Sequence, residues 1–591
     1  MSAPAYRELT DSAVVLGIMQ GVVLNVAFVY ASLKLGFSIG GSTVAAIMGY
    51  AILRGILRKG TMVENNINQT IASGINTAGT GIVFTVPALY MLNAKAVAEG
   101  GQAFDFPVLP LAIAGIAGAV LGVSVIIPLR KQMIELDRLR FPSGVATSTI
   151  IRAGSAGLNK ATLLAIGVLI SAVWKYGLDQ HWLDMGEERV RETGFGIVGE
   201  ELIFSFKILP EYCAPVLSLS IMNMAAGMLA GRGGLPFFLG GALSWWVVAP
   251  FAANAGWVSE PIGESAGTIY GSMLRPMGIG VLVGGALMGL VMAFPAIKGA
   301  LKSLVSAAKT SHAGGANRRD ELGLKSVVTG LIVGMILFFV ASRLTPGVSV
   351  PQAILSAVVG TIWLAIAALI VSQATGMTDI SPMSGMALIS VTLMMFLLDK
   401  NIAGAMVVGV AVCVAIGQGA DMMQDLKTGF MIGARPISQQ VVQFGTTWLG
   451  ALIALAAVHI LWTGGVNGAN GFGEGTSLPA PQGGALMGII EAVRDNNVPV
   501  DKYSLGAMIG ATLGAAPFSG LGVLIGLSMY LPFSITLGYG IGCFVQILIQ
   551  RLTSVATCEK ILVPLAAGLI VGEALTGVAL TAFRIAFQTG T

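Results

Sequence analysis

Apolar runs long enough to cross a lipid bilayer recur from one end of the sequence to the other. A membrane-spanning helix needs about 20 consecutive, predominantly apolar residues. The candidate spans are 11–33, 38–57, 64–92, 107–129, 161–178, 212–231, 235–257, 274–297, 326–344, 351–373, 376–398, 401–419, 436–462, 504–529, 530–550 and 557–584. We therefore expect an all-α polytopic membrane protein with about 16 transmembrane helices and no sizeable soluble domain.

The composition excludes the soluble classes. Of the 591 residues, 55% are hydrophobic and 10% are charged, whereas soluble domains carry about 25% charged residues. The first apolar run begins near Ser12 with no basic region before it, so we interpret it as a membrane anchor and not as a cleaved signal peptide. The four cysteines occur singly, without Cys-x-x-Cys spacing, so neither a disulfide framework nor a metal site is indicated.

Two shorter segments, 141–152 and 478–493, open with proline. Segments of this kind are typical of re-entrant or broken membrane helices. A half-helix that starts inside the membrane presents free N–H groups and the positive end of its dipole to an anionic substrate group. Ser143, Thr147 and Gln482 lie near these starts and are predicted to bind substrate. The alternative is an ordinary helix start with a proline in its first turn.

Lysine and arginine residues predict the orientation in the membrane, because cytoplasmic loops carry an excess of both. They gather at 54–59, 130–140 and 298–325, which we expect to face the cytoplasm. The loops 93–106 and 179–211 are acidic or poor in basic residues, and we expect them to face outside.

The basic segment near the middle divides the chain into halves that echo each other. The motif Leu-Pro-Phe-Phe-Leu-Gly-Gly at 235–241 is similar to Leu-Pro-Phe-Ser-Ile-Thr-Leu-Gly at 531–538 in the other half. Internal repeats are common in secondary transporters, with the substrate near the repeat interface. The sequence leaves open whether the repeats are parallel or inverted. The predicted parts are an N-terminal transmembrane repeat, a basic cytoplasmic linker and a C-terminal transmembrane repeat, at 1–297, 298–325 and 326–591.

The stretch 64–77 is polar, although it continues directly into an apolar run. On a helix its polar residues share one face, and isoleucines and alanines take the other. A polar face is costly in a bilayer unless it lines a water-filled path or a helix interface, so we interpret it as part of a transport route, with interhelical hydrogen bonding as the alternative. The stripe consists of Asn66, Thr70, Ser73 and Thr77, flanked by Asn65, Gln69 and Asn76.

Six carboxylates lie in or beside apolar runs and are candidates for proton coupling: Glu64, Asp379, Asp421, Asp425, Glu491 and Glu573. Intramembrane acids often carry protons, and with only three histidines in the chain a histidine relay is disfavoured. Asp379 and Ser381 lie in a polar stretch of the second half that matches 64–77. Asp421 and Asp425 share a helix face, with Lys427 nearby as a possible ion-pair partner. Solvent-exposed helix ends and interhelical hydrogen bonds are the alternatives.

Several motifs together resemble the oligopeptide transporter family in its bacterial branch. The most specific are Gln-Asp-Leu-Lys-Thr-Gly at 424–429 and Leu-Pro-Ala-Pro-Gln at 478–482, supported by Phe-Pro-Ser-Gly-Val-Ala-Thr at 141–147, Tyr-Leu-Pro at 530–532 and Gly-Leu-Ile-Val-Gly-Glu-Ala at 568–574. The Asn-Pro-Gly and Lys-Ile-Pro-Pro-Arg motifs of the fungal and plant peptide branch do not occur.

The resemblance implies a sixteen-helix secondary transporter, coupled to protons, that imports small peptides. In the related yellow-stripe-like branch the substrates are metal complexes of amino-acid-derived chelators. We predict that two polar stretches and two proline-led segments face one central cavity between the repeats. The predicted substrate-binding residues are Asn65, Asn66, Gln69, Thr70, Ser143, Thr147, Ser381, Gln482 and Tyr530.

The functional prediction is a secondary active transporter that imports small oligopeptides with protons across the bacterial cytoplasmic (inner) membrane. Chelate uptake is the second interpretation and a passive channel the third. The sequence has no phosphate-binding loop of the kind that a nucleotide-driven pump needs. A membrane pyrophosphatase would need dense acidic clusters, and an intramembrane aspartyl protease would need two aspartates on separate helices, for which Asp421 has no convincing partner. We expect no enzyme activity, cofactor or nucleic-acid partner. The oligomeric state is left open.

Overall fold

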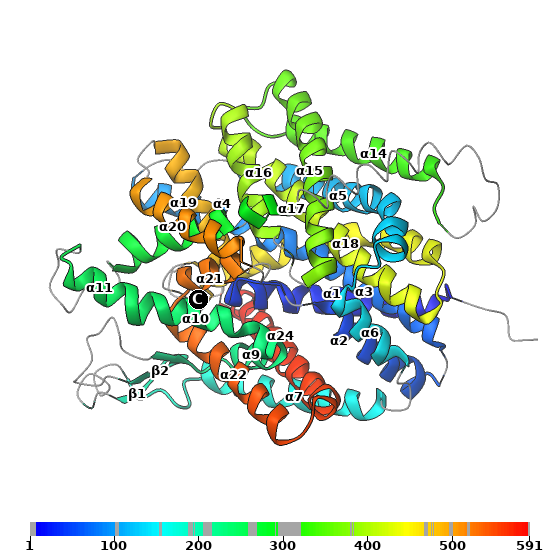
Figure 1. Ribbon diagram of the computed structural model, residues 1–591, viewed down its shortest axis with the longest axis horizontal. Helices are drawn as coiled ribbons and strands as arrows, with labels where there is room; N and C mark the ends of the chain where they lie inside the picture. The colour runs from blue at the N-terminus through cyan, green and yellow to red at the C-terminus, as the bar shows by residue number, and fades with distance from the viewer. Residues whose placement is uncertain are drawn as a thin grey trace, which may run out of the picture.

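Long apolar helices make up most of the protein (Figure 1). The computed structural model describes residues 8–588 apart from 39, 59, 101–105, 153–156, 187–192, 194, 205–215, 258–268, 286, 290, 293–320, 379–380, 382, 466–470, 474–475, 477, 496–499 and 517–520. The predicted linker 298–325 lies almost wholly outside the described residues.

Eleven helical segments within the described residues are long and apolar enough to cross a membrane. The prediction of an all-α polytopic membrane protein is therefore confirmed in its broad form, while the count of sixteen stays a prediction. Shorter apolar helices also occur, among them Gly41–Ile56 and Gly385–Leu397. In place of the two expected spans 212–231 and 235–257 there is one candidate membrane-spanning segment, Ile221–Asn254, in which the Gly-Arg-Gly-Gly turn at Gly231–Gly234 separates two helices and Gly231 has a positive φ of 54°.

The elements of the first half include two interrupted helix pairs, α1 with α2 and α3 with α4. The helices are α1 (Asp11–Leu35), α2 (Gly41–Tyr50), α3 (Met62–Val83), α4 (Val86–Ala98), α5 (Val108–Ile126), α6 (Pro142–Arg152), α7 (Gly157–Asp179), α9 (Ile221–Ala230), α10 (Leu235–Leu243) and α11 (Ala249–Asn254). Short 3-10 or π turns adjoin them at η1 (Ala51–Ile56), η2 (Ile127–Leu129), η3 (Lys131–Leu136), η6 (Gly231–Gly234), η7 (Ser244–Val248) and η8 (Tyr270–Leu274).

All the regular secondary structure in the described residues of the second half is helical. Its helices are α14 (Leu324–Arg343), α15 (Val350–Thr378), α16 (Met383–Leu397), α17 (Ile402–Ile432), α18 (Pro436–Thr463), α19 (Pro481–Asp495), α20 (Val500–Gly514), α21 (Leu521–Tyr530), α22 (Phe533–Leu552), α23 (Val555–Thr557) and α24 (Val563–Gln588), with the π turn η9 (Cys558–Leu562). The proline-led segments are confirmed as short helices: α6 has 11 residues and α19 has 15, and neither reaches the roughly 20 residues that a span needs.

A small antiparallel sheet interrupts the helical pattern within the predicted outer loop and just after it. Its strands are β1 (Phe195–Val198), β2 (Glu201–Phe204) and β3 (Val216–Ser218), in the order β1-β2-β3. Phe195 pairs with Phe204 and Glu201 pairs with Ser218. No pattern in the sequence predicted this sheet, because strands of three or four residues leave little periodic signal beside long helices.

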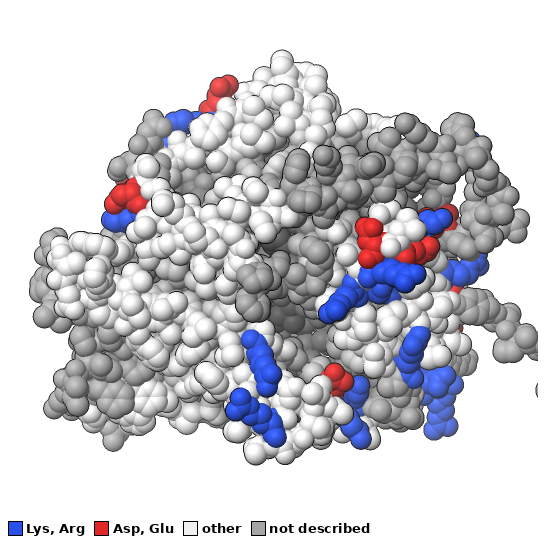
Figure 2. Space-filling view, viewed as in Figure 1, with Lys and Arg blue, Asp and Glu red and all other residues white. Residues whose placement is uncertain are grey.

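The surface matches a protein embedded in lipid. Lys and Arg side chains gather over one end of the face in Figure 2, and most of its remaining described surface carries no charge. Large apolar side chains such as Leu109, Leu169 and Ile336 are more than half exposed on predicted spans. Exposed apolar surface on this scale is typical of helices that contact a membrane.

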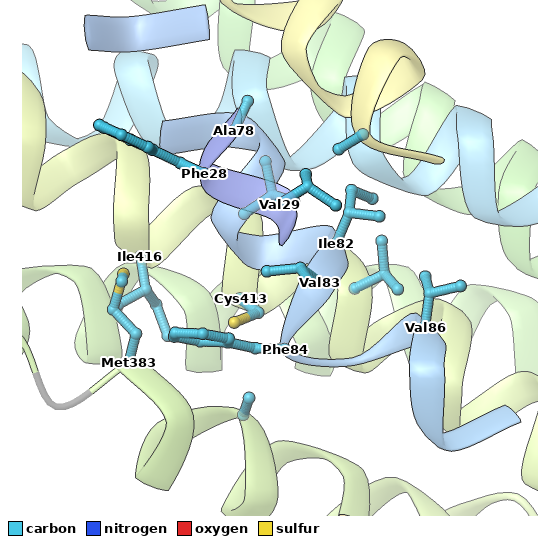
Figure 3. Packing of buried hydrophobic residues seen from close by; sticks show 14 of the residues in the cluster. Phe28, Val29, Ala78, Ile82, Val83, Phe84, Val86, Met383, Cys413 and Ile416 are labelled. Atoms are coloured by element: carbon cyan, nitrogen blue, oxygen red, sulfur yellow. The ribbon is translucent and has the colours of Figure 1, made fainter. Parts of the chain in front are cut away.

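The core joins α1, α3, α16 and α17 (Figure 3). These helices pack through side chains that are almost fully enclosed, including Phe28, Val29, Ala78, Ile82, Val83, Met383, Cys413 and Ile416. Close backbone approach accompanies this packing. The amide of Asn25 in α1 donates to the carbonyl oxygens of Ile75 (2.6 Å) and Gly450 (3.1 Å), and so ties α1 to both α3 and α18.

A glycine at the contact of α18 with α3 provides a test of this packing. A methyl group added at Gly450 would lie 1.9 Å from the carbonyl oxygen of Ile75. Gly450→Ala should therefore push the helices apart and lower stability by about 1–3 kcal/mol, measured by thermal unfolding in detergent. Gly445→Ala on the same helix, where an added methyl meets no atom within 4 Å, is the control. Equal stability of the two variants would contradict the close packing.

Candidate functional site

A cavity of about 340 Å³ lies where four helix N-termini meet the middle of α17. Gly40, Ser143, Met383 and Gln482 line it from the starts of α2, α6, α16 and α19. Backbone N–H groups in a helix's first turn lack partners within the helix, and the helix dipole places partial positive charge there. The cavity therefore has several weakly positive walls.

The break between α1 and α2 forms one side of this cavity. Gly36 ends α1 with a left-handed φ of 77°, and Gly36, Phe37, Ser38 and Gly40 all line the space. The segment before α19 holds the break in place. The backbone amide nitrogen of Ala480 donates to the carbonyl oxygen of Leu33 at 2.8 Å. The side-chain amide of Gln482 donates to the carbonyl oxygen of Gly36 at 2.6 Å.

Among the described residues that line the cavity, Asp421 is the one with a carboxylate side chain. It projects from α17, and its oxygens lie 2.7 and 2.8 Å from the hydroxyl oxygen of Ser73 on α3. Thr77 provides a second hydroxyl contact. Within the described residues, no ion pair to Asp421 is present. It can therefore offer its charge to a cation that enters the cavity.

Asp425 lies one turn further along α17 and is fully enclosed. Its carboxylate accepts hydrogen bonds from Gln69 on α3, from Ser42 on α2 (3.2 Å) and from Gln443 on α18 (3.2 Å). All three donors are neutral. Asp425 likewise forms no ion pair with any described residue. Two acidic side chains without a cationic partner in the described structure therefore share one face of α17.

The predicted polar stripe of α3 faces α17 and α18, and its residues divide into two groups. Gln69 binds Asp425, and Thr70 accepts a hydrogen bond from Gln439 on α18 (2.9 Å). Asn65 donates to the carbonyl oxygen of Ala46 (3.0 Å), and Asn66 donates to Gln69 (3.1 Å). These four are buried between helices, whereas Thr77 and Thr80, further along α3, line the cavity.

The structure brings three other predicted substrate-binding residues together. Ser143, Ser381 and Gln482, from segments far apart in sequence, all line the same cavity. Thr147 lies one turn after Ser143 and is buried beside Thr43, with 3.4 Å between their hydroxyl oxygens. Tyr530 ends α21, and its side chain lies outside the described residues.

Two of the predicted proton-coupling acids, Glu64 and Glu491, are not among the residues that line the cavity, and a third is not described. Glu64 closes a capping box at the start of α3, where it accepts from the backbone of Thr61 at 2.6 Å. Glu491 on α19 forms an ion pair with the exposed Lys95 on α4 at 2.8 Å. Asp379 lies outside the described residues.

Glu573 belongs to a separate, balanced cluster of buried charges. Lys34, in the last turn of α1, lies 3.3 Å from Glu573 on α24 and 2.7 Å from Glu200 at the turn between β1 and β2. Lys175 on α7 also pairs with Glu200. Glu573 further accepts from the hydroxyl of Ser220 (2.5 Å) and the backbone of Met222 (2.8 Å). No periodic pattern links Lys34 to Glu573, although Lys34 follows directly on the apolar run 11–33 and is a cation between two predicted spans.

The cluster predicts a specific pattern of stability. Lys34→Met leaves Glu573 without a cation, and breaking a buried ion pair costs about 3–5 kcal/mol. Lys34→Met/Glu573→Gln removes the stranded charge and retains the Lys175–Glu200 pair, so it should unfold at a higher temperature than Lys34→Met alone. A double variant that is less stable than the single one would contradict the pairing.

Glu200 has an altered acidity because of its two lysine partners. Burial alone would raise its pKa, but the charges of Lys34 and Lys175 outweigh burial and hold the pKa of Glu200 well below its usual range. A carboxyl group whose pKa is lower in the folded than in the unfolded state stabilises the fold above the unfolded pKa. This stabilisation is lost as the pH falls.

Thermal stability in detergent should therefore fall as the pH is lowered below about 4.3, the usual pKa of glutamate. Glu200→Gln should be less stable than the unchanged protein at pH 7, because Lys175 loses its carboxylate, and the gap should narrow at low pH. Melting temperatures measured across this range check the prediction. A gap that is constant with pH would contradict it.

Comparison with known proteins gives one family and two kinds of relative. The family described as OPT oligopeptide transporter protein matches residues 8–584. A Haemophilus influenzae protein named "Putative oligopeptide transporter" is 27% identical, over 95% of this chain and 93% of its own length. Two rice proteins, "Probable metal-nicotianamine transporter YSL11" and "Iron-phytosiderophore transporter YSL15", are 25% and 24% identical, each over 76% of this chain and over 68% and 71% of their own lengths.

Proposed function

The chain belongs to the OPT oligopeptide transporter family, and on this premise we propose that it imports short peptides together with protons. The observation that carries the proposal is the placement of Asp421 in a cavity whose other walls are helix N-termini. A peptide has an ammonium group at one end and a carboxylate at the other. Asp421 would bind the ammonium group, and the N–H groups at the helix starts would bind the carboxylate.

The cavity also suits a peptide by its size and polarity. Its volume of about 340 Å³ lies near the lower end of the range of about 300–1,000 Å³ for small-molecule sites. Ser143, Ser381 and Gln482 line it and provide polar groups for peptide amides. A space of this size favours peptides of two or three residues in this conformation.

The similarity to chelate transporters makes uptake of metal complexes the second candidate. In such a complex the amine nitrogens bind the metal, so the complex offers Asp421 no ammonium group. The single acid in the described lining therefore favours a free peptide.

We place the transporter in the bacterial cytoplasmic membrane, where a proton gradient is available. Two repeated halves, 1–297 and 326–591, with sixteen helices in all, would alternate access to the cavity between them. The broken pair α1–α2 and the short helices α6 and α19 support this mechanism over a passive channel, because interrupted helices at a central site are typical of secondary transporters.

Uptake of labelled tripeptides into proteoliposomes with an imposed pH gradient tests the proposal. Asp421→Asn should reduce uptake at least about tenfold, equivalent to about 1.4 kcal/mol of binding free energy. N-acetylated peptides lack the ammonium group and should be taken up equally poorly by the unchanged protein. Asp421→Asn should weaken their uptake no further, because the two changes remove the same interaction.

Asp501→Asn is the matched control, since Asp501 is an exposed aspartate in the first turn of α20 and is not among the residues that line the cavity, and its uptake should stay within about twofold. Equal uptake of free and acetylated peptides would contradict the role of Asp421. Uptake that is unchanged when the pH gradient is collapsed would contradict proton coupling. Saturable uptake of an iron chelate without peptide uptake would favour the second candidate.

A further inference from the structure

A second cavity, of about 320 Å³, adjoins the one that contains Asp421. Residues of α2, α9 and α24 are among those that line it. Ser38 and Gly40, at the boundary between the two cavities, are exposed, so part of this boundary is open space and not packed side chains. The residues that line both cavities are Phe37, Ser38, Gly40, Ser143, Gln424 and Tyr539.

The wall of the second cavity that faces away from this boundary is apolar. None of the described residues that line the second cavity is Asp, Glu, Lys, Arg or His, whereas Asp421 lines the first. A charged group would lose its water in the second cavity without gaining a partner of opposite charge. The space therefore suits an apolar group. The apolar residues include Phe28, Val44, Leu229, Val563, Ala567 and Ile570.

Two polar residues line the second cavity without lining the first, and their hydroxyl groups already have partners. The hydroxyl oxygen of Ser42 lies 2.7 Å from that of Ser73, and the hydroxyl oxygen of Thr43 lies 3.4 Å from that of Thr147. Neither hydroxyl group therefore needs a polar ligand to compensate for its burial. The remaining polar residues of the described lining lie at the shared boundary: Ser38, Ser143, Gln424 and Tyr539.

We propose that the second cavity takes the side chain of the first residue of the peptide, so that the protein selects peptides with an apolar residue at the amino terminus. The inference rests on the proposed function, because that function places the ammonium group of the peptide at Asp421. The side chain of the first residue branches from the carbon that carries this ammonium group. It is thus the peptide side chain that starts nearest to Asp421.

The spacing along α17 brings this side chain to the second cavity. Asp421 and Gln424 are three residues apart, and residues at this spacing are neighbours on a helix surface, with about 5–6 Å between their β-carbons. Asp421 lines the first cavity and Gln424 lines both. A group held at Asp421 therefore lies within one helical turn of the shared boundary. Successive side chains of an extended peptide point to opposite sides, so the second residue would face away from the second cavity.

Uptake of three tripeptides into proteoliposomes tests the side-chain preference. Leu-Gly-Gly should have a KM at least about tenfold lower than Gly-Gly-Gly, because even one methylene group in a hydrophobic pocket changes specificity by about this factor. Lys-Gly-Gly should have a KM at least about tenfold higher than Leu-Gly-Gly, because its side-chain ammonium group would enter an uncharged cavity. Equal KM values for the three peptides would overturn the inference and leave the proposed function in place.

Ala567→Phe fills the second cavity with an aromatic ring. Ala567 is buried on α24 and lines the second cavity but not the first. The change should raise the KM for Leu-Gly-Gly, relative to that for Gly-Gly-Gly, by at least about tenfold. Gly-Leu-Gly and Gly-Gly-Leu place the same side chain elsewhere, so their KM relative to Gly-Gly-Gly should change by no more than about twofold.

Ala582→Phe is the matched control, since Ala582 is an exposed alanine on the same helix and lines neither cavity. The KM for Leu-Gly-Gly relative to that for Gly-Gly-Gly should stay within about twofold of the value for the unchanged protein.

Leu229→Ala should produce the opposite shift, which a misfolded protein cannot produce. Leu229 on α9 lines the second cavity and is half-buried, so shortening its side chain enlarges the space. The KM for Trp-Gly-Gly, relative to that for Leu-Gly-Gly, should fall by at least about threefold. An unchanged ratio would contradict the placement of the first side chain.

Two further results would overturn the inference. If Ala567→Phe changes the KM of every tripeptide by the same factor, the second cavity has a packing role or holds a lipid acyl chain. If Ala567→Phe affects Gly-Leu-Gly or Gly-Gly-Leu as strongly as Leu-Gly-Gly, the first residue does not occupy the cavity. A failure of the proposed function has a different signature, which is that the unchanged protein takes up none of the peptides, and that result would remove the inference with it.

Discussion

Two carboxylates enclosed between helices, without a cation beside them among the described residues, impose the strongest constraint on this structure. Burying an acid is costly unless hydrogen bonds or a proton compensate for the lost water. Gln69, Ser73, Ser42 and Gln443 provide those hydrogen bonds from three different helices. The positions of α2, α3 and α18 around α17 are therefore tied to the chemistry of the site as well as to apolar packing.

The protein contains buried charge of two kinds, and they suit different tasks. Lys34, Lys175, Glu200 and Glu573 form a neutral set in which every charge has an opposite partner, and this set joins α1, α7 and α24 to the small sheet. Asp421 and Asp425 have neutral donors only. A balanced cluster holds helices in place, whereas an unbalanced pair is free to respond to a cation from outside.

Local features of the sequence predicted a large part of this arrangement. The polar stripe of α3, the short helices α6 and α19, and the grouping of Ser143, Ser381 and Gln482 follow from helical periodicity and from proline positions, which act over a few residues. The partners of these elements could not be predicted in the same way. Ser73 and Asp421 are 348 residues apart, and no periodicity links positions so distant. Glu573 was a lone acid in sequence and acquires Lys34 only through folding. Its proton role, like that of Glu64, remains a prediction.

The break between α1 and α2 has a consequence for how such a cavity can change. The carbonyl oxygen of Leu33 accepts from the backbone of Ala480, and a methyl group added at Gly36 would lie 2.3 Å from Pro481. This junction between distant parts of the chain thus depends on main-chain atoms, one glycine and the side chain of Gln482. Other residues lining the cavity can be exchanged while the junction keeps its shape, so a new substrate preference can arise without a new fold.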